Sequence, residues 1–370
     1  MQISISCPVY DSFRVRQVSG MFDVALREKV TQTFHIDQPP VDGDWKIGLI
    51  VGPSGSGKST IARHVFGREL YAVGDWPDDK AVVDCFGDKS IREITYLLTS
   101  VGFSSPPSWI KPYHVLSNGE RFRCDLARAI ADSTTPGKTE NTEYRSDASN
   151  HESLVVFDEF TSVVDRNVAK VGSAAIAKGI KSGKMPCRFV AVTCHYDVTE
   201  WLEPDWVLDM ATGTVTRRSL RRPPIHLRIV RCHRDAWTLF KRHHYLSADL
   251  PYGTRNYLAL WNEEPVTFCA MIPMFGKRHH WRVSRIVTLP DYQGIGIGST
   301  VLKGMAELYR EANQRVGITT SHPAMIAHCK NSPHWRTITI KQAGSKKNRY
   351  GKYQGTMNRA VVSFEYEEER

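Results

Sequence analysis

The sequence lacks the features that mark disulfide-bonded, secreted and membrane-spanning proteins. Its eight cysteines include no C-x-x-C pair, which argues against a zinc ribbon and a disulfide framework. The longest apolar runs, such as IGLIV at 47–51, are far shorter than the roughly 20 residues that cross a bilayer. The first ten residues, MQISISCPVY, have no basic start followed by an apolar stretch, unlike a signal peptide. We therefore expect a cytoplasmic protein with no membrane partner.

Acidic residues are scarce in the second part of the chain. Residues 221–370 hold 24 Lys/Arg against 11 Asp/Glu, a net charge of +13, whereas residues 1–220 hold 25 against 28, a net charge of −3. This asymmetry favours a polyanionic partner for the second part. A solvated basic face with a pocket for a polyphosphate cofactor would give the same charge.

The length of 370 residues predicts two domains. The turn residues, arginines and Pro-Pro of TGTVTRRSLRRPPIH at 212–226 are typical of a linker, so we predict domains at 1–220 and 221–370. The polar segment 134–152 has no periodicity and is predicted to be a flexible insertion in the first domain.

A phosphate-binding loop is predicted at 52–60, where GPSGSGKST follows an apolar strand and precedes a helical pattern. Glycines let backbone N–H groups converge on phosphates, the lysine adds a charge, and the helix N-terminus adds its dipole. The predicted ATP contacts are Gly52, Ser54, Gly55, Gly57, Lys58, Ser59 and Thr60.

Two further strands end in residues suited to ATP hydrolysis. SLVVFDEF at 153–160 places Asp158 to hold Mg²⁺ together with Ser59, and Glu159 to deprotonate the attacking water. FVAVTCH at 189–195 ends in His195, a candidate contact to the γ-phosphate.

VLSNGERFRCDLARAIA at 115–131 resembles the LSGGQ signature of the ABC ATPase family, with Asn118 and Glu120 as departures. Asp165, in TSVVDR, matches the D-loop of that family. The resemblance spans roughly residues 20–215. It implies that Ser117, Asn118 and Gly119 close on the γ-phosphate held by a partner's phosphate loop, and hence an ATP-dependent homodimer.

One element of that family is absent, because no glutamine occurs from 59 to 116, where the family links Mg²⁺ to a partner domain. Asp84 or Asp88 is the candidate replacement. ABC ATPases that are not transporters resemble clamps that work on nucleic acid, and the fused second domain favours that group over a membrane transporter.

A second glycine run, DYQGIGIG at 291–298, does not fit a dinucleotide fold, because it reads G-x-G-x-G and the next strand ends without an acid. It fits Q-x-x-G-x-G and resembles the acetyl-coenzyme-A pyrophosphate loop of the GNAT N-acetyltransferases. The resemblance implies acetyl-CoA or another acyl-CoA as cofactor. The contacts that it implies are Val287, Leu289, Gln293, Gly294, Gly296, Gly298 and Ser299.

The strands and helices expected around this loop follow the order of the same family over about 226–370. We therefore predict an α/β chain: an ABC-type P-loop NTPase domain followed by a mixed-sheet α+β GNAT acyltransferase domain.

The usual acid and base of that family are missing. RVSRIVTLP, before the loop, contains no carboxylate, and SHPAMIAHCKNSPHW contains no tyrosine. Ser321 and His322 are the candidate catalytic residues, because histidine titrates near neutral pH. His328 and Cys329 lie behind them, and the segment 243–245 (HHY) is a further candidate.

The acceptor is expected to be nucleic acid, with DNA favoured over RNA. The segment 341–361 interleaves basic residues with two tyrosines, which suits phosphates and bases. HHYLS at 243–247 also resembles a segment of the phage Mom DNA-modifying proteins. We predict an ATP-dependent, acyl-CoA-using transferase. The alternatives are a protein or small-amine N-acetyltransferase with a regulatory ATPase, and a non-enzymatic ATP-gated clamp.

Overall fold

The computed structural model of the protein describes residues 1–26, 29–67, 70–71, 74–133, 153–217, 222–244, 249–342 and 360–367. The predicted insertion at 134–152 lies outside the described residues, as do 343–359 of the basic segment and 245–247 of HHYLS.

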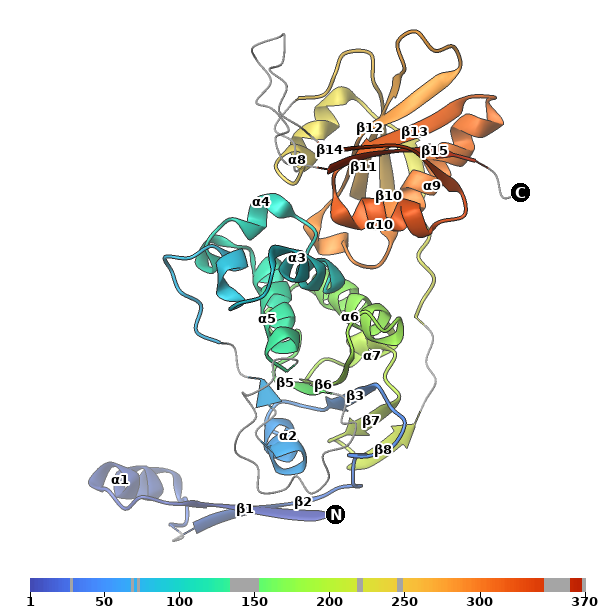
Figure 1. Ribbon diagram of the computed structural model, residues 1–370. Helices are drawn as coiled ribbons and strands as arrows, with labels where there is room; N and C mark the ends of the chain where they lie inside the picture. The colour runs from blue at the N-terminus through green and yellow to red at the C-terminus, as the bar shows by residue number, and fades with distance from the viewer. Residues whose placement is uncertain are drawn as a thin grey trace. The chain divides into compact units, whose positions relative to one another are not determined.

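The chain folds into two compact units (Figure 1). The first unit comprises Met1–Val73, Asp132–Val163 and Pro186–Arg222, and the second comprises Gly74–Ala131, Val164–Met185 and Pro223–Arg370. One unit boundary thus falls close to the predicted border at 220/221. Two earlier segments, however, group with the C-terminal part rather than with the phosphate loop.

The first unit is built on a six-stranded sheet in the order β4-β5-β6-β3-β7-β8. Its strands are β4 (Leu70–Tyr71), β5 (Ser153–Phe157), β6 (Cys187–Thr193), β3 (Ile47–Val51), β7 (Trp206–Asp209) and β8 (Thr214–Arg217). All neighbours are parallel except β7 and β8. Every residue of β3 is buried, as expected for a strand covered on both faces. Apart from α1, which is described below, the named helical elements that lie within this unit are α2 (Lys58–Phe66), η4 (Tyr196–Val198) and α7 (Thr199–Leu202).

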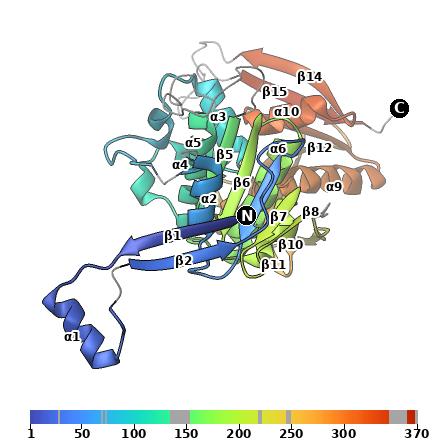
Figure 2. The ribbon, with the colours of Figure 1, turned by 90° about the horizontal axis from the view of Figure 1, so that it is seen from below.

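A two-stranded antiparallel ribbon, β1 (Gln2–Pro8) with β2 (Lys29–His35), also belongs to the first unit. Figures 1 and 2 show helix α1 (Phe13–Phe22) at the end of the ribbon opposite the N-terminus of the chain. Ser12 caps α1 by accepting the N–H of Val15, yet no residue of the helix is buried.

The second unit begins with a group of helices. These are η2 (Val82–Cys85), α3 (Ile91–Ser100), α4 (Pro106–Trp109), η3 (Tyr113–Val115), α5 (Asn118–Ser133), whose last two residues lie beyond the unit boundary, and α6 (Arg166–Lys181). Helix α5 buries most of its residues, because it packs on α6: a Cβ on Gly172 would lie 2.8 Å from the ring of Phe122. We call Gly74–Ala131 and Val164–Met185 together the helical segment.

The rest of the second unit is a seven-stranded sheet in the order β14-β15-β13-β12-β11-β10-β9. Its strands are β9 (Arg228–Arg231), β10 (Arg255–Trp261), β11 (Glu264–Pro273), β12 (His280–Thr288), β13 (Arg315–Thr320), β14 (Trp335–Gln342) and β15 (Ala360–Tyr366). Only β12 and β13 are parallel neighbours. Its helical elements are η5 (Arg234–Ala236), α8 (Trp237–Lys241), η6 (Pro290–Tyr292), α9 (Ile297–Glu311) and α10 (Pro323–Asn331).

Strands β12 and β13 part along their length. Pairing runs from His280 with Arg315 to Val283 with Ile318, whereas β12 continues to Thr288. The strand order expected over 226–370 is confirmed, and the parted strands point to the turn at 289–296 between β12 and α9.

The core of the first unit depends on a large side chain lying over a glycine. A Cβ added to Gly48 would lie 2.1 Å from the ring of Trp206, its register partner on β7. Trp45 and Phe66 pack on the same indole, with ring centroids at 5.5 and 6.3 Å.

We expect Gly48→Ala to destabilise the first unit by about 1–3 kcal/mol, because the buried indole has to leave its position. Urea denaturation followed by circular dichroism measures this. Gly20→Ala is the control, because a Cβ there meets nothing within 4 Å in helix α1. Equal stability of G48A and the unchanged protein would contradict the packing.

Candidate functional site

The predicted ATP residues meet at one edge of the first sheet. Because β5, β6 and β3 are adjacent and parallel, their carboxyl ends lie side by side. Gly52 follows β3, Asp158 and Glu159 follow β5, and His195 lies two residues beyond β6.

The phosphate loop delivers the N-terminus of α2 without a side-chain cap. Gly57 is the N-cap, with φ 84°. Among the described residues, no side chain accepts a hydrogen bond from the N–H groups that begin the helix, and no acidic residue lies in the first turn. The ring of Phe34 on β2 lies 2.5 Å from the position of a Gly57 Cβ, so only glycine fits. Nζ of Lys58 donates to the carbonyl of Pro53 at 2.8 Å. The amides of this turn and the ammonium therefore form an anion-binding end.

The predicted magnesium ligands lie together. Oγ of Ser59 donates to Oδ1 of Asp158 at 2.9 Å. Among the described residues, no three His, Cys, Asp or Glu side chains form a metal cluster. A hydroxyl and one carboxylate fit Mg²⁺, which completes its shell with phosphate oxygens and water.

Glu159 has a strained backbone, with φ 51° in the left-handed region. Its N–H donates to Oδ1 of Asp158 at 3.0 Å, and its carboxylate accepts from Oγ of Ser162 at 2.6 Å. Thr161, with φ 68°, is a second outlier in the same turn. Two outliers in the turn that carries the predicted base are typical of a backbone conformation kept for function. His195 donates its N–H to Oγ1 of Thr193 at 3.2 Å.

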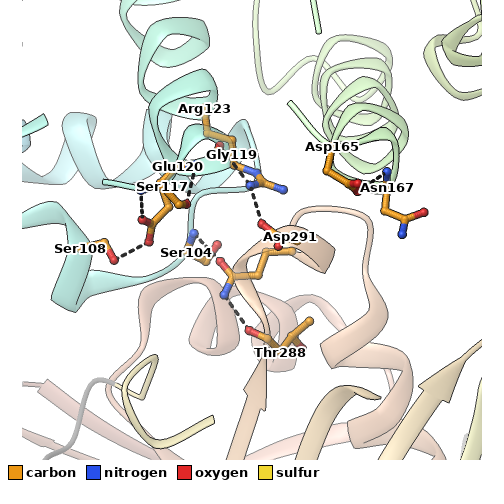
Figure 3. A network of polar contacts seen from close by, with 11 residues as sticks. Ser104, Ser108, Ser117, Gly119, Glu120, Arg123, Asp165, Asn167, Thr288 and Asp291 are labelled. Carbon is orange, nitrogen blue, oxygen red and sulfur yellow. Dashed lines mark hydrogen bonds and ion pairs between the residues drawn. The ribbon is translucent and has the colours of Figure 1, made fainter. Parts of the chain in front are cut away.

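The signature region begins helix α5 with a reciprocal cap (Figure 3). The N–H of Ser117 donates to Oε2 of Glu120 at 3.0 Å, and the N–H of Glu120 donates back to Oγ of Ser117 at 3.3 Å. Oε1 of Glu120 accepts from Ser108 at 2.7 Å. Glu120, a departure from the family pattern, thus acts as a capping-box carboxylate. Asn118 and Gly119 open the helix, and Asp165 caps α6 by accepting the N–H of Asn167 at 2.8 Å.

The second glycine run lies against this helical segment. Oε1 of Gln293 accepts the N–H of Ser104 at 2.7 Å, while its Nε2 donates to the carbonyl of Thr288 at 2.8 Å. A Cβ on Gly294 would lie 2.7 Å from Cα of Gly102 and 2.8 Å from Cβ of Ala175. Gln293 therefore fixes the loop to the helical segment, and its amide has both ends bonded.

Asp291 extends the same contact to the signature. Figure 3 shows its carboxylate pointing to Arg123, with Oδ1 3.9 Å from Nη1, beside Gly119. A Cβ on Gly119 would lie 3.1 Å from that oxygen. Burial raises the pKa of Asp291 and lowers that of Arg123, whose guanidinium is fully buried. Within the described part of the chain, Nε and Nη2 of Arg123 have no hydrogen-bond partner.

The expected acyl-CoA residues form a second anion-binding end at α9. Gly296 is its N-cap with φ 98°, and within the described residues no side chain caps it. A Cβ on Gly298 would lie 2.9 Å from Oγ1 of Thr288, so the close approach of this loop to Thr288 requires a glycine at position 298. Ser299 donates to the carbonyl of Gly296 at 2.8 Å. These residues fit a pyrophosphate on the open amides of the turn.

Val287 and Leu289 face the core. Val287 is buried in a cluster with Trp237 and Phe268, and Leu289 packs against it. Any contact of Val287 with acyl-CoA is therefore through the main chain.

His322 also contacts the helical segment. Its Nε2 lies 3.3 Å from the carbonyl oxygen of Ser104, and its N–H donates to Oγ1 of Thr320 at 3.0 Å. A carbonyl can only accept, so Nε2 carries a proton and Nδ1 is the basic nitrogen of the neutral ring. Burial lowers the pKa of His322, which favours that neutral form. Ser321 precedes it, half-buried.

The other histidines named from the sequence differ in their surroundings. His244 is buried against Trp237, with ring centroids at 5.6 Å. Burial lowers the pKa of His243 and of His328. Asp84 and Asp88 are both exposed in the second unit.

Sequence reasoning missed Ser104, Arg123 and Lys178, which approach the second loop from the helical segment. None stands in a motif near that loop. The only available signal was that Arg123 lies on the otherwise apolar face of a helical pattern.

Comparison with known proteins agrees with the C-terminal fold. The model of the acetyltransferase (GNAT) family matches residues 223–328, which confirms the expected GNAT domain. No curated protein sequence matches the chain significantly.

The solved structures similar to the chain include acetyltransferases and ATP-binding cassettes. An IAA acetyltransferase from Bacillus cereus shares 16% identity, with 39% of this chain and 100% of that chain covered and a TM-score of 0.31. A Bacillus subtilis acetyltransferase in complex with CoA shares 11%, covering 39% and 99%, with a TM-score of 0.30. A dimeric ATP-binding cassette bound to ADP and Pi shares 16%, covering 48% and 86%, with a TM-score of 0.35. No helix in the described residues is long and apolar enough to cross a membrane.

We expect Glu159→Gln to slow ATP hydrolysis about 100-fold or more while ATP still binds, because the carboxylate that accepts the proton of water is lost. Sedimentation with ATP should then show a stable dimer. Glu200→Gln, at an exposed position of α7, is the matched control. Unchanged hydrolysis by E159Q would exclude Glu159 as the base.

Proposed function

We propose that this protein is an ATP-dependent transferase that uses acetyl-CoA or another acyl-CoA to modify nucleic acid, with DNA favoured over RNA. In this proposal, an ABC-type ATPase dimer loads or remodels the substrate. The observation that carries the link is a pair of hydrogen bonds made by the main chain of Ser104. Its N–H donates to Gln293, and its carbonyl oxygen accepts from His322. The expected cofactor loop and the candidate base are thus both attached to the segment that leads into the ATPase signature.

Acyl transfer can be assigned to residues around the parted strands. Acyl-CoA held at the turn before α9 would supply the acyl group as a thioester, and the acceptor would displace the CoA thiol, which leaves with the proton that the acceptor gives up. Main-chain groups of β12 beyond Val283 are not paired with β13 and can bind an extended ligand arm. His322 takes the proton of the acceptor, because histidine is the candidate base beside the parted strands.

Coupling to ATP is supported by the contact of Asp291 with Arg123 and Gly119. By the family resemblance, Gly119 closes on the γ-phosphate held by the partner. Nε and Nη2 of the buried Arg123 have no hydrogen-bond partner among the described residues. They can therefore accommodate a shorter contact with Asp291 when this region moves. ATP binding and acyl-CoA binding then change one another's affinity reciprocally.

A nucleic-acid acceptor is supported by the charge of the C-terminal part and by the β11–β12 hairpin. Phe275 is fully exposed at its tip, next to Lys277, Arg278 and His279. The guanidinium of Arg234 lies 5.1 Å from the ring of Tyr252, which is 91% exposed. Exposed rings beside cations suit bases beside phosphates.

We expect Asp291→Asn to weaken the coupling severalfold, because Arg123 loses its carboxylate partner. The measurement is the acyl-CoA dissociation constant with and without ATP in the E159Q background. Asp249→Asn, which removes an ion pair with Lys241, is the control. If ATP shifts acyl-CoA affinity equally in D291N and D249N, the proposed link is wrong.

The acceptor is tested by DNA and RNA binding over a salt series. We expect affinity to fall with salt, DNA to raise ATP hydrolysis, and labelled acetyl-CoA to label nucleic acid. The Lys277→Ala/Arg278→Ala pair should reduce the slope of log K against log salt by about 2, since two phosphate contacts are lost. Lys303→Ala/Lys330→Ala removes the same charge from helices α9 and α10 as the control.

Label in protein or small molecules would support the alternative N-acetyltransferase. DNA binding with no acetyl transfer would support a non-enzymatic clamp. That alternative is favoured by one feature of the sequence, the lack of a carboxylate in β12.

A further inference from the structure

The first unit carries helix α1 away from its core on the ribbon of β1 and β2, and we call these three elements together the arm (Figure 2). At the base of the arm, Ile3 is buried and Phe34 packs against the core cluster of the sheet. All other residues of the two strands are exposed, as far as Pro8 and its partner Lys29. At about 3.3 Å per residue, the paired strands place α1 roughly 20 Å from the base. The core of the first unit therefore does not cover the helix.

Helix α1 and its flanks expose large apolar side chains on more than one side. Phe13 and Phe22 are the first and last residues of the helix, so at about 100° per residue they lie on opposite sides of it. No residue of α1 is buried. A helix that is apolar on several sides is normally covered by other structure. The large apolar residues between positions 10 and 24 that are each at least 52% exposed are Tyr10, Phe13, Val18, Met21, Phe22 and Val24.

The stability of the arm also calls for a covering partner. Helix α1 has 10 residues, fewer than the roughly 12–15 that a helix needs to be stable alone in water. An isolated two-stranded ribbon is likewise marginal. The local contacts are the cap by Ser12 and a hydrogen bond from Oγ of Ser19 to the carbonyl of Val24 at 2.6 Å. These bonds hold the ends of the helix but bury none of its apolar side chains.

The charge of the region favours a second copy of this chain over nucleic acid or a lipid surface. Residues 10–26 hold two arginines and two aspartates, a net charge of zero. Nε of Arg16 donates to Oδ1 of Asp11 at 2.7 Å, so one of these pairs is already formed. Binding to phosphates or anionic headgroups needs an excess of cations. A two-fold contact instead brings identical surfaces together, which is favourable when they are apolar and carry no net charge.

The exposed area fits a dimer as well. The six apolar residues present on the order of 700 Å², since an aromatic residue alone can bury about 150–250 Å². An interface of standard size takes about 800 Å² from each partner. The patch on two copies is therefore close to the size that a stable dimer needs.

We propose that α1 and its flanking residues bind the same region of a second copy of this chain, so that the protein is a dimer before ATP binds. This contact goes beyond the ATP-dependent dimer of the proposed function and does not require it. Closure on ATP would then take place within a preformed dimer, at the high effective concentration that a second, separate contact provides.

The test is sedimentation velocity of the full chain without nucleotide over a series of micromolar concentrations. We expect the unchanged protein to dimerise, and Phe13→Ser/Phe22→Ser to weaken the dimer about tenfold or more, because two large apolar side chains leave the interface. Ile91→Ser/Ile110→Ser is the matched control, because both isoleucines are more than 60% exposed and lie outside the arm. Circular dichroism should show both double variants folded.

A protein that stays monomeric at every concentration without nucleotide would overturn the proposal. Equal dimerisation of the arm variant, or an equal loss in the isoleucine variant, would overturn it too. So would binding of DNA or phosphatidylserine vesicles that depends on Phe13 and Phe22 in a monomeric protein, because the occupant would then be different.

The ATP-dependent dimer is tested separately, by adding Glu159→Gln to the arm variant. ATP should restore its dimer, because the proposed ATP contact does not involve the arm. If ATP has no effect there while the unchanged protein dimerises through the arm, the ATP-dependent contact is wrong and the arm contact stands.

Discussion

The main chain of Ser104 attaches the expected cofactor loop and His322 to the helical segment. Its N–H binds the amide of Gln293, 189 residues further on, and its carbonyl binds the imidazole of His322. These bonds fix three things together: the turn at the start of α9, the tautomer of His322 and the approach of Gly294 to Gly102. A shift of the 102–104 turn would therefore disturb the cofactor loop and the candidate base at once.

The two glycine runs differ in which parts of the chain supply the residues around them. In the phosphate loop, one continuous stretch supplies the glycines, the lysine and the hydroxyl. In the second loop, the glycines come from residues 294–298, Gln293 is used to attach the turn, and the nearest ammonium is Lys178 on another segment. Local sequence carries the first site, whereas only tertiary structure assembles the second.

This difference explains what the sequence could predict. The strands ending at Val51, Phe157 and Thr193 are apolar and largely buried. The sequence therefore shows each of them as a short apolar run followed by polar residues. The Q-x-x-G-x-G spacing located the second loop for the same reason. Ser104, Arg123 and Lys178 could not be predicted, because their partners lie more than a hundred residues away and no local rule selects a main-chain group or one lysine of a helix.

The grouping of the helical segment with the C-terminal sheet has a consequence for how ATP could act. A signature that closes on a partner's nucleotide has to move with the structure to which it is packed. Here that structure includes η6, whose Asp291 contacts Gly119 and Arg123, and the loop that follows it. The buried Arg123 makes this contact sensitive to small shifts, because a buried charge loses much when its partner moves away. The proposed coupling therefore requires no hinge between the signature and the expected cofactor loop, because the two are parts of one compact unit.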